Sequence, residues 1–164
     1  MEKRQLSQTV PHLAAVAYPA HRAGPSLMRI GRDNVREHLG RPQRLLLDLR
    51  SPEEYSGERV SDYSFKVDHG DERTGRIPGA VHLYFKDLLN ADDSFKSADQ
   101  LAPVLAAAGI APEKFDDVVC YCRLSHRATL AWVALAHLLG FGNIKIYDGS
   151  WTEWGSIVGF PIEK

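Results

Sequence analysis

The sequence predicts a single α/β domain whose sheet is mainly parallel and flanked by helices. Short apolar runs of strand length alternate along the chain with segments of helical period. The runs are apolar throughout, which is typical of strands that are buried on both faces of a parallel sheet. A length of 164 residues suffices for one substantial core and is short for two domains.

The first elements are predicted by local signals. Residues 1–28 contain several prolines and show no sustained period, so we interpret them as a linker or N-terminal arm. A short helix is expected next, with Asp33 or Asn34 as its N-cap and Gly40 as its stop. The apolar run over residues 44–50 predicts a buried strand.

Two capping boxes mark the starts of later helices. Ser51 and Glu54 form the first, with Pro52 at the first helical position, and Ser97 with Gln100 forms the second. Between them, residues 56–75 are polar and patternless, which indicates a long surface loop. The remaining predicted elements are strands near 77–85, 116–121 and 143–147, and helices over 97–108 and 127–139.

Composition narrows the function classes. The formal net charge is −1, so nothing suggests a general attraction to nucleic acid or to an anionic membrane surface. No run approaches the roughly 20 apolar residues that a membrane span requires. The two cysteines do not form a disulfide framework, and the apolar part of the N-terminus is too interrupted to predict a signal peptide. We therefore expect a cytoplasmic protein.

Ligands of parallel α/β sheets bind at the carboxyl ends of the strands. The residues at the predicted ends are Asp48, Arg50, Tyr84, Phe85, Cys122, Asp148 and Gly149. Cys122 follows its strand directly and is joined to the next helix by a short connection. Such a connection aims backbone N–H groups at one point, and Arg123 and Arg127 add positive charge, so a Cys122 thiolate is favoured there.

Cys120 lies inside the apolar run and is predicted to be a core residue. A metal clip would need further ligands, and the seven histidines are scattered without metal-ligand spacing, so no metal or other cofactor is expected. Cysteine phosphatases carry Cys, five residues, then Arg. From Cys122, Arg127 comes one position too early, and the shorter loop favours a single sulfur atom over a tetrahedral phosphate.

The loop CRLSHR, residues 122–127, resembles the six-residue active-site loop of rhodanese domains, the thiosulfate sulfurtransferases. The resemblance extends to residues 46–58, 75–85 and 146–154 in the order of the family. It implies a rhodanese-like three-layer fold, with a catalytic domain over residues 29–164. This domain is similar to the C-terminal half of two-domain rhodaneses.

The resemblance also implies an enzyme that moves a sulfane sulfur from thiosulfate to cyanide or a thiol through a persulfide on Cys122. The substrate-binding residues are then Arg123, Leu124, Ser125, His126 and Arg127. Arg123 argues for thiosulfate, because mercaptopyruvate-type members tend to have a small residue there. Many related loops have glycine where this chain has Ser125, which either takes a positive φ with strain or offers its hydroxyl to substrate or helix.

Asp48 and Arg50 match the family's DxR motif, and Arg76 precedes its IPGA turn. Two roles of Asp48 remain open: a hydrogen bond toward the cysteine loop, or an ion pair that braces the strand ends. Glu54 is a possible ion-pair partner for an arginine. For Arg76 a structural role is expected.

Two other functions remain open, mercaptopyruvate sulfurtransfer and a rhodanese-like sulfur-relay or binding module without turnover. The expected partners are a small-molecule sulfur donor and acceptor. A second copy of the chain or a partner rhodanese-like domain could cover the pocket, whereas nucleic acid and membrane are not expected partners.

Overall fold

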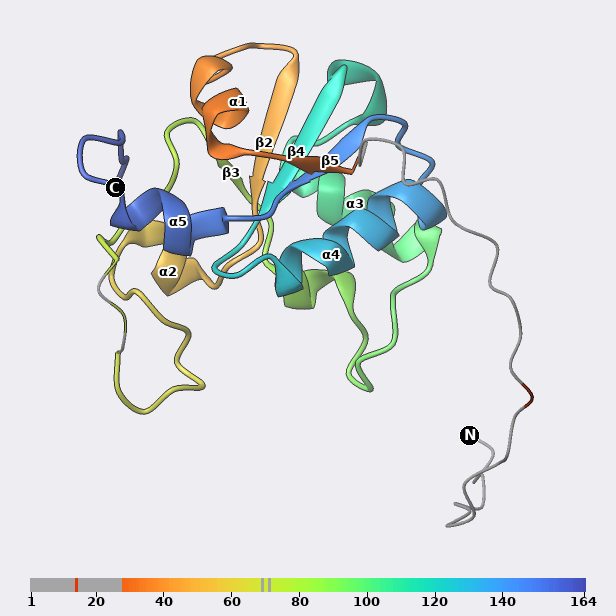
Figure 1. Cartoon of the computed structure of the whole chain (residues 1–164). Coiled ribbons are helices and arrows are strands. Elements are labelled where there is room, and N and C mark those ends of the chain that lie inside the picture. Colours follow the sequence, from red (N-terminus) through yellow and green to blue (C-terminus); the bar gives the residue numbers. More distant parts are fainter. Residues whose placement is uncertain (1–13, 15–27, 69, 71) are drawn as a thin grey trace.

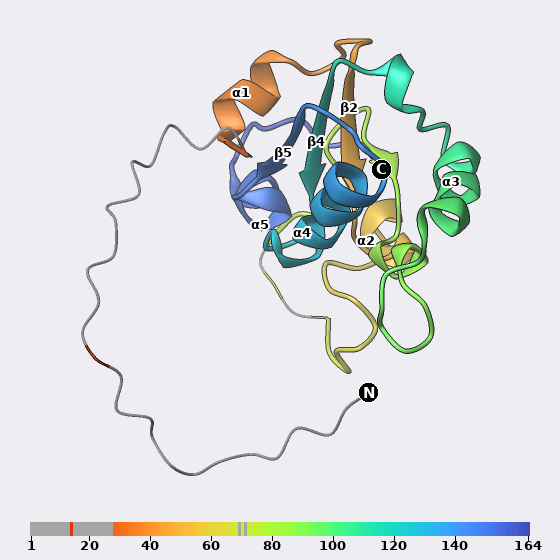
Figure 2. The same ribbon diagram turned by 90° about the vertical axis from the view of Figure 1, so that its right-hand side faces the viewer.

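The computed structural model describes residue 14, residues 28–68, residue 70 and residues 72–164 (Figure 1). Most of the arm predicted over residues 1–28 therefore lies outside the described residues. The described chain forms one sheet with helices on both of its faces, as Figures 1 and 2 show. This arrangement confirms the predicted α/β fold class.

The sheet has five strands in the order β1-β5-β4-β2-β3, and every neighbouring pair is parallel. The strands are β1 (Arg29–Ile30), β2 (Arg44–Asp48), β3 (Val81–His82), β4 (Asp117–Tyr121) and β5 (Ile144–Tyr147). Four of them agree with the predicted strands, and the short β1 was not predicted. The last four residues of both β2 and β4 are buried, as expected of central strands covered on both faces.

Five α-helices of the described residues cover the sheet: α1 (Arg32–Glu37), α2 (Pro52–Ser56), α3 (Ala98–Ala107), α4 (His126–Val133) and α5 (Ser150–Ser156). Two 3₁₀ helices are η1 (Phe85–Leu88) and η2 (Pro112–Lys114), and a π-helical segment, η3 (Ala134–Leu138), continues α4. Both predicted capping boxes are present, at the starts of α2 and α3.

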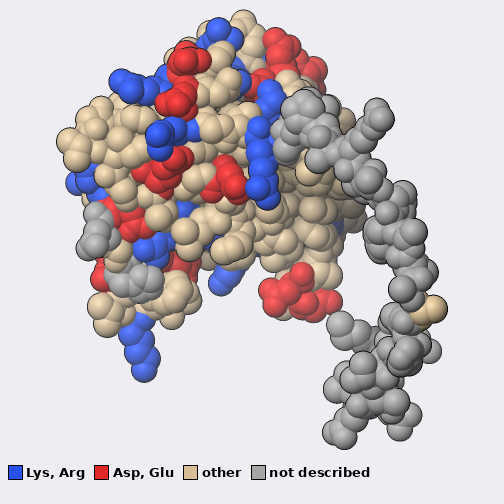
Figure 3. Space-filling view, viewed as in Figure 1, with Lys and Arg blue, Asp and Glu red and all other residues tan. Residues whose placement is uncertain are grey.

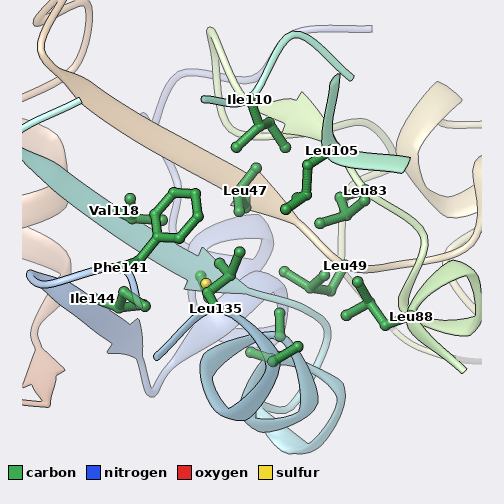
Figure 4. Close-up of a cluster of buried hydrophobic side chains, with 14 of the residues drawn as sticks. Leu47, Leu49, Leu83, Leu88, Leu105, Ile110, Val118, Leu135, Phe141 and Ile144 are labelled. Carbon is green, nitrogen blue, oxygen red and sulfur yellow. The ribbon is translucent and has the colours of Figure 1, made fainter. Parts of the chain in front are cut away.

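Two apolar clusters hold the layers together. In the first, side chains of β2, β4 and β5 pack against α3 and α4. Figure 4 shows Leu47 of β2 and Leu49, which follows the end of β2, in this cluster with Leu105 of α3. In the second, on the other face, Val35 of α1 packs with Trp151 and Trp154 of α5. Apolar burial on both faces fixes the sheet and, with it, the positions of the strand ends.

One local prediction is wrong. The N-cap of α1 is Gly31, in extended conformation and without a side-chain cap, instead of Asp33 or Asn34. The helix starts earlier because it follows β1 directly, which leaves Asp33 in its first turn, where an acidic side chain suits the helix dipole. The helix predicted over residues 127–139 is present and ends before Gly140, which has a positive φ. After Val133 its hydrogen bonding becomes π-helical, with Leu139 N donating to Ala134 O.

No helix in the described part of the chain is long and apolar enough to cross a membrane. Acidic and basic side chains are interspersed on the face shown in Figure 3. An anion that binds this face must therefore be attracted by local groups.

Parallel pairing brings the strand ends to one edge. Asp48 at the end of β2 pairs in register with Tyr121 at the end of β4 and with His82 at the end of β3. Cys122 follows Tyr121 directly, so the cysteine loop, residues 122–127, lies at the carboxyl edge of the sheet, where ligands of such folds bind.

Candidate active site

The cysteine loop is fixed at its start by backbone contacts with α5. Trp151 N donates to Cys122 O at 2.9 Å, and Thr152 N donates to Arg123 O at 3.1 Å. These bonds tie the loop to the first turn of the helix that follows β5. The loop is thus positioned by a second strand end as well as by its own.

Ser150 braces the loop from inside, and the sequence did not single it out. Its buried hydroxyl accepts the N–H of Cys122 at 3.3 Å and the N–H of Ser125 at 3.2 Å, and donates to Tyr147 O at 2.9 Å. The one signal in the sequence was its place just after a strand that ends at the same edge. Two loop N–H groups are consequently engaged inside the protein.

Ser125 has a positive φ of 61° with ψ of −14°, the kind of conformation that favours glycine. Its hydroxyl donates to Asp148 O at 2.6 Å and lies 3.1 Å from Asp148 Oδ1. It makes no side-chain cap to α4. Hydrogen bonds to the β5–α5 turn therefore offset the strain of a serine at this position.

Three other backbone N–H groups of the loop are without an acceptor in the described part of the chain. Among the described residues, nothing accepts a hydrogen bond from the backbone N–H groups of Leu124, His126 and Arg127. These groups lie at the start of α4, where the helix dipole also favours negative charge. The loop can therefore hold an anion.

Cys122 is 1% exposed and lies in the wall of a cavity of about 320 Å³. The cavity is lined by Glu54, Asp62, Ser64, Phe65, Phe85, Lys86, Cys122, Arg123, Leu124, His126 and Arg127. The structure thus brings four of the five predicted substrate-binding residues to this cavity. Ser125, which is buried, is not among the lining residues. His126 is exposed, and Leu124 is 53% exposed at the rim.

Arg127 is held between a buried carboxylate and the cysteine. Its Nη1 and Nη2 donate to Glu54 Oε2 at 2.6 Å and Oε1 at 2.8 Å, a bidentate pair. Burial lowers the pKa of the Arg127 guanidinium, but the hydrogen bonds and charge of Glu54, together with the Cys122 side chain, raise it, and the net direction is upward. A permanently charged group therefore faces the thiol.

Arg123 meets a second carboxylate. Its Nε lies 3.3 Å from Glu72 Oε1, and the side chains of the pair are 14% and 5% exposed. Burial raises the pKa of the Glu72 carboxyl, but hydrogen bonds from its own backbone N–H, from Arg123 and from Thr152 lower it more, and the net direction is downward. Glu72 lies in the patternless loop, and no sequence signal marked it.

Asp48 and Arg50 form a fully buried ion pair beneath the site. Arg50 Nη2 donates to Asp48 Oδ2 at 2.6 Å and to Gly75 O at 2.7 Å, and Tyr121 Oη donates to Asp48 Oδ2 at 2.7 Å. The Arg50 guanidinium also lies 4.4 Å from the centre of the Trp151 ring. The pair joins the ends of β2 and β4 to α5. Within the described part of the chain, no hydrogen bond runs from Asp48 to the cysteine loop.

Arg76 does not line the cavity. Its guanidinium pairs with Glu163 and lies 4.6 Å from the centre of the Tyr55 ring. Backbone bonds between Arg76 and Glu163 run in both directions, at 2.8 Å and 3.0 Å. This residue attaches the C-terminal segment to the turn before β3.

Cys120 is fully buried within β4, in the same apolar cluster as Leu47. Burial, and to a smaller extent the neighbouring Cys122, raises the pKa of the Cys120 thiol to about 12. The described residues contain no group of three or more His, Cys, Asp or Glu side chains placed to hold a metal ion.

The chain is similar in sequence to known proteins. The Rhodanese-like domain family matches residues 32–157. "Sulfur carrier protein TtuD" of Thermus thermophilus is 40% identical over 99% of this chain and 57% of its own length. "Putative thiosulfate sulfurtransferase" of Saccharopolyspora erythraea is 38% identical over the whole of this chain and 56% of its own. The chain thus spans little more than half the length of these relatives.

Solved structures show the same likeness. An anaerobic ergothioneine biosynthesis enzyme from Chlorobium limicola, in complex with trimethyl histidine, superposes with a TM-score of 0.71 at 27% identity. The match covers 85% of this chain and 32% of that enzyme. A structure of EanB that carries a cysteine persulfide gives a TM-score of 0.72, also at 27% identity, over 84% of this chain and 32% of EanB.

Proposed function

Because the chain belongs to the rhodanese-like family of sulfurtransferases, we propose that it transfers a sulfane sulfur from thiosulfate to a thiophilic acceptor through a persulfide on Cys122. One observation carries this proposal. Cys122 lies in the wall of a cavity, beside the Arg127 guanidinium and at the start of a helix whose first N–H groups have no acceptor among the described residues. These features favour a thiolate and an anionic persulfide.

In the first step the Cys122 thiolate attacks the outer sulfur of thiosulfate. The S–S bond of the donor breaks, sulfite leaves with its electron pair, and Cys122 becomes a persulfide. Arg127 offers charge to the donor, and the N–H groups of Leu124, His126 and Arg127 stabilise the terminal sulfur. Glu54 holds the Arg127 side chain in this position.

In the second step an acceptor attacks the terminal sulfur of the persulfide. Cyanide leaves as thiocyanate, while a thiolate acceptor becomes a persulfide, and either way the Cys122 thiolate is regenerated. The cavity of about 320 Å³ has room for an acceptor larger than cyanide.

Thiocyanate formation from thiosulfate and cyanide tests the proposal. The wild-type chain is expected to turn over, and Cys122→Ser is expected to be inactive while unfolding at the same temperature. An active Cys122→Ser variant, or a folded wild-type chain that forms no persulfide, would contradict the proposal.

A sulfur-relay function is the second candidate, favoured by the name of the Thermus relative, a sulfur carrier protein. In this case Cys122 accepts the sulfur but passes it only to a specific partner. A wild-type persulfide that forms without thiocyanate turnover would favour the relay.

A further inference from the structure

Arg123 is engaged with Glu72 although it lines the cavity. Besides the contact through Nε, Arg123 Nη2 lies 3.4 Å from Glu72 Oε2. Thr152 Oγ1 donates to Glu72 Oε1 at 3.0 Å, so the first turns of α5 also hold this carboxylate. The charge of Arg123 is thus compensated within the protein.

The pair lies close to residues 57–68, which we call the mouth segment because Asp62, Ser64 and Phe65 in it line the cavity. Gly70 has a φ of +134°, and a Cβ at this position would overlap with Glu72, Arg123 and Val60. Val60 belongs to the mouth segment and is only 7% exposed. The pair and Val60 therefore approach each other around Gly70, at a position where only glycine fits.

The mouth segment has a defined shape of its own. The Asp68 carboxylate accepts the N–H of Ser61 at 2.8 Å and the N–H of Val60 at 3.1 Å. Further along the segment, Ser64 and Phe65 line the cavity, and Phe65 is 49% exposed. A displacement of Val60 would therefore be transmitted to the side chains at the mouth.

The structure assigns a positioning role to the Arg123–Glu72 pair: it holds the mouth segment against the cysteine loop and so limits the size of the sulfur donor that reaches Cys122. This inference rests on the proposed function, since it concerns the donor of the same site. The positioning role requires Glu72 as much as Arg123. A direct role for Arg123 in binding thiosulfate would not require Glu72.

Two donors of different size isolate this effect. With thiosulfate the Cys122 thiolate attacks the outer sulfur and sulfite leaves. With benzenethiosulfonate it attacks the terminal sulfur, the S–S bond breaks, and benzenesulfinate leaves with the electron pair. The enzyme product is the same Cys122 persulfide, so the ratio of the two rates reports access of the donor.

The experiment measures kcat/KM for persulfide formation from each donor in wild type, Glu72→Gln, Arg123→Gln and the double variant. In both single variants, the ratio of kcat/KM for benzenethiosulfonate to kcat/KM for thiosulfate is expected to rise by about tenfold. The double variant should change it no further, because the two residues act as one unit. Glu113→Gln, an exposed glutamate on η2, serves as the control and should leave the ratio unchanged.

If Arg123 instead binds the donor directly, Glu72→Gln should leave thiosulfate turnover unchanged or faster, and only Arg123→Gln should impair it. That result would overturn the inference. Hydrogen exchange of residues 57–68 gives a readout that does not depend on activity, and it should be faster in both single variants. Unchanged exchange would also overturn the inference, whereas a wild type that forms no persulfide from either donor refutes the proposed function alone.

Discussion

Arg127 and Glu54 are joined by two parallel hydrogen bonds, and the same carboxylate accepts the N–H of Ser51 at 3.0 Å to complete the capping box of α2. Glu54 is fully buried, whereas the Arg127 side chain is 19% exposed. One carboxylate therefore links the start of α2 to the cysteine loop and directs the guanidinium toward Cys122.

Glu54→Gln should lower the free energy of unfolding by about 1–3 kcal/mol, because Arg127 loses its counter-charge while a polar group still reaches Ser51 N. The partial exposure of Arg127 keeps the loss below that of a fully buried pair. Urea denaturation measures the effect. Glu53→Gln on the same helix, which keeps Glu54, should stay within about 0.5 kcal/mol of wild type. Equal stability of the two variants would refute the coupling.

Ser125 provides a second test, since its strain and its hydrogen bonds can be separated. Ser125→Ala keeps the positive φ and loses the bonds to Asp148, so unfolding should become easier by about 1–3 kcal/mol. Ser125→Gly loses the same bonds but removes the strain. Its free energy of unfolding should therefore be about 1 kcal/mol higher than that of Ser125→Ala. Ser156→Ala, an exposed serine on α5, is the control. An alanine variant as stable as wild type would show that the bonds do not matter.

The two cysteines should differ in reactivity. Cys120 is fully buried with a thiol pKa near 12, so it stays protonated at pH 8. Brief treatment with iodoacetamide, followed by peptide mapping, should find alkylation at Cys122 only. Cys120→Ala should retain sulfur transfer and lose about 1 kcal/mol of stability from the apolar contacts that are removed. Loss of transfer at unchanged stability would contradict the structural role of Cys120.

The lowered pKa of Glu72 predicts a pH-dependent contribution to stability. A carboxyl whose pKa is lower in the folded protein stabilises it above the unfolded value of about 4.3, and this contribution disappears as the pH falls through the folded value. The difference in unfolding free energy between wild type and Glu72→Gln should therefore be present at pH 7 and shrink below about pH 4. A difference that does not change with pH would mean that Glu72 is not held as the structure indicates.

Local signals in the sequence predicted much of the fold. The capping box at Ser51 and Glu54 and the apolar run that became β2 each contain their own evidence within a few residues. The start of α1 was misplaced because β1, which has only two residues, is too short to produce a pattern. Its pairing with β5, more than 100 residues later, could not be inferred from the local sequence.

The residues of the candidate site also fall into two groups, those that the local sequence identifies and those that it does not. Cys122 and Arg127 could be selected because the loop is continuous in sequence and its spacing is informative. Ser150 and Glu72 contact this loop from segments that are 28 and 51 residues away, as in the bonds Cys122–Ser150 and Arg123–Glu72. Such partners depend on how the strand ends converge, which only the folded structure shows.

The proposed sulfur transfer requires that Cys122 carries the transferred sulfur. Incubation of the wild-type chain with thiosulfate in the absence of any acceptor, followed by mass spectrometry of the intact chain and of its peptides, tests it most directly. We predict an adduct with the mass of one sulfur atom on the peptide that contains Cys122, absent from Cys122→Ser and lost after cyanide is added. An adduct on Cys120, or no adduct on a folded wild-type chain, would contradict the account.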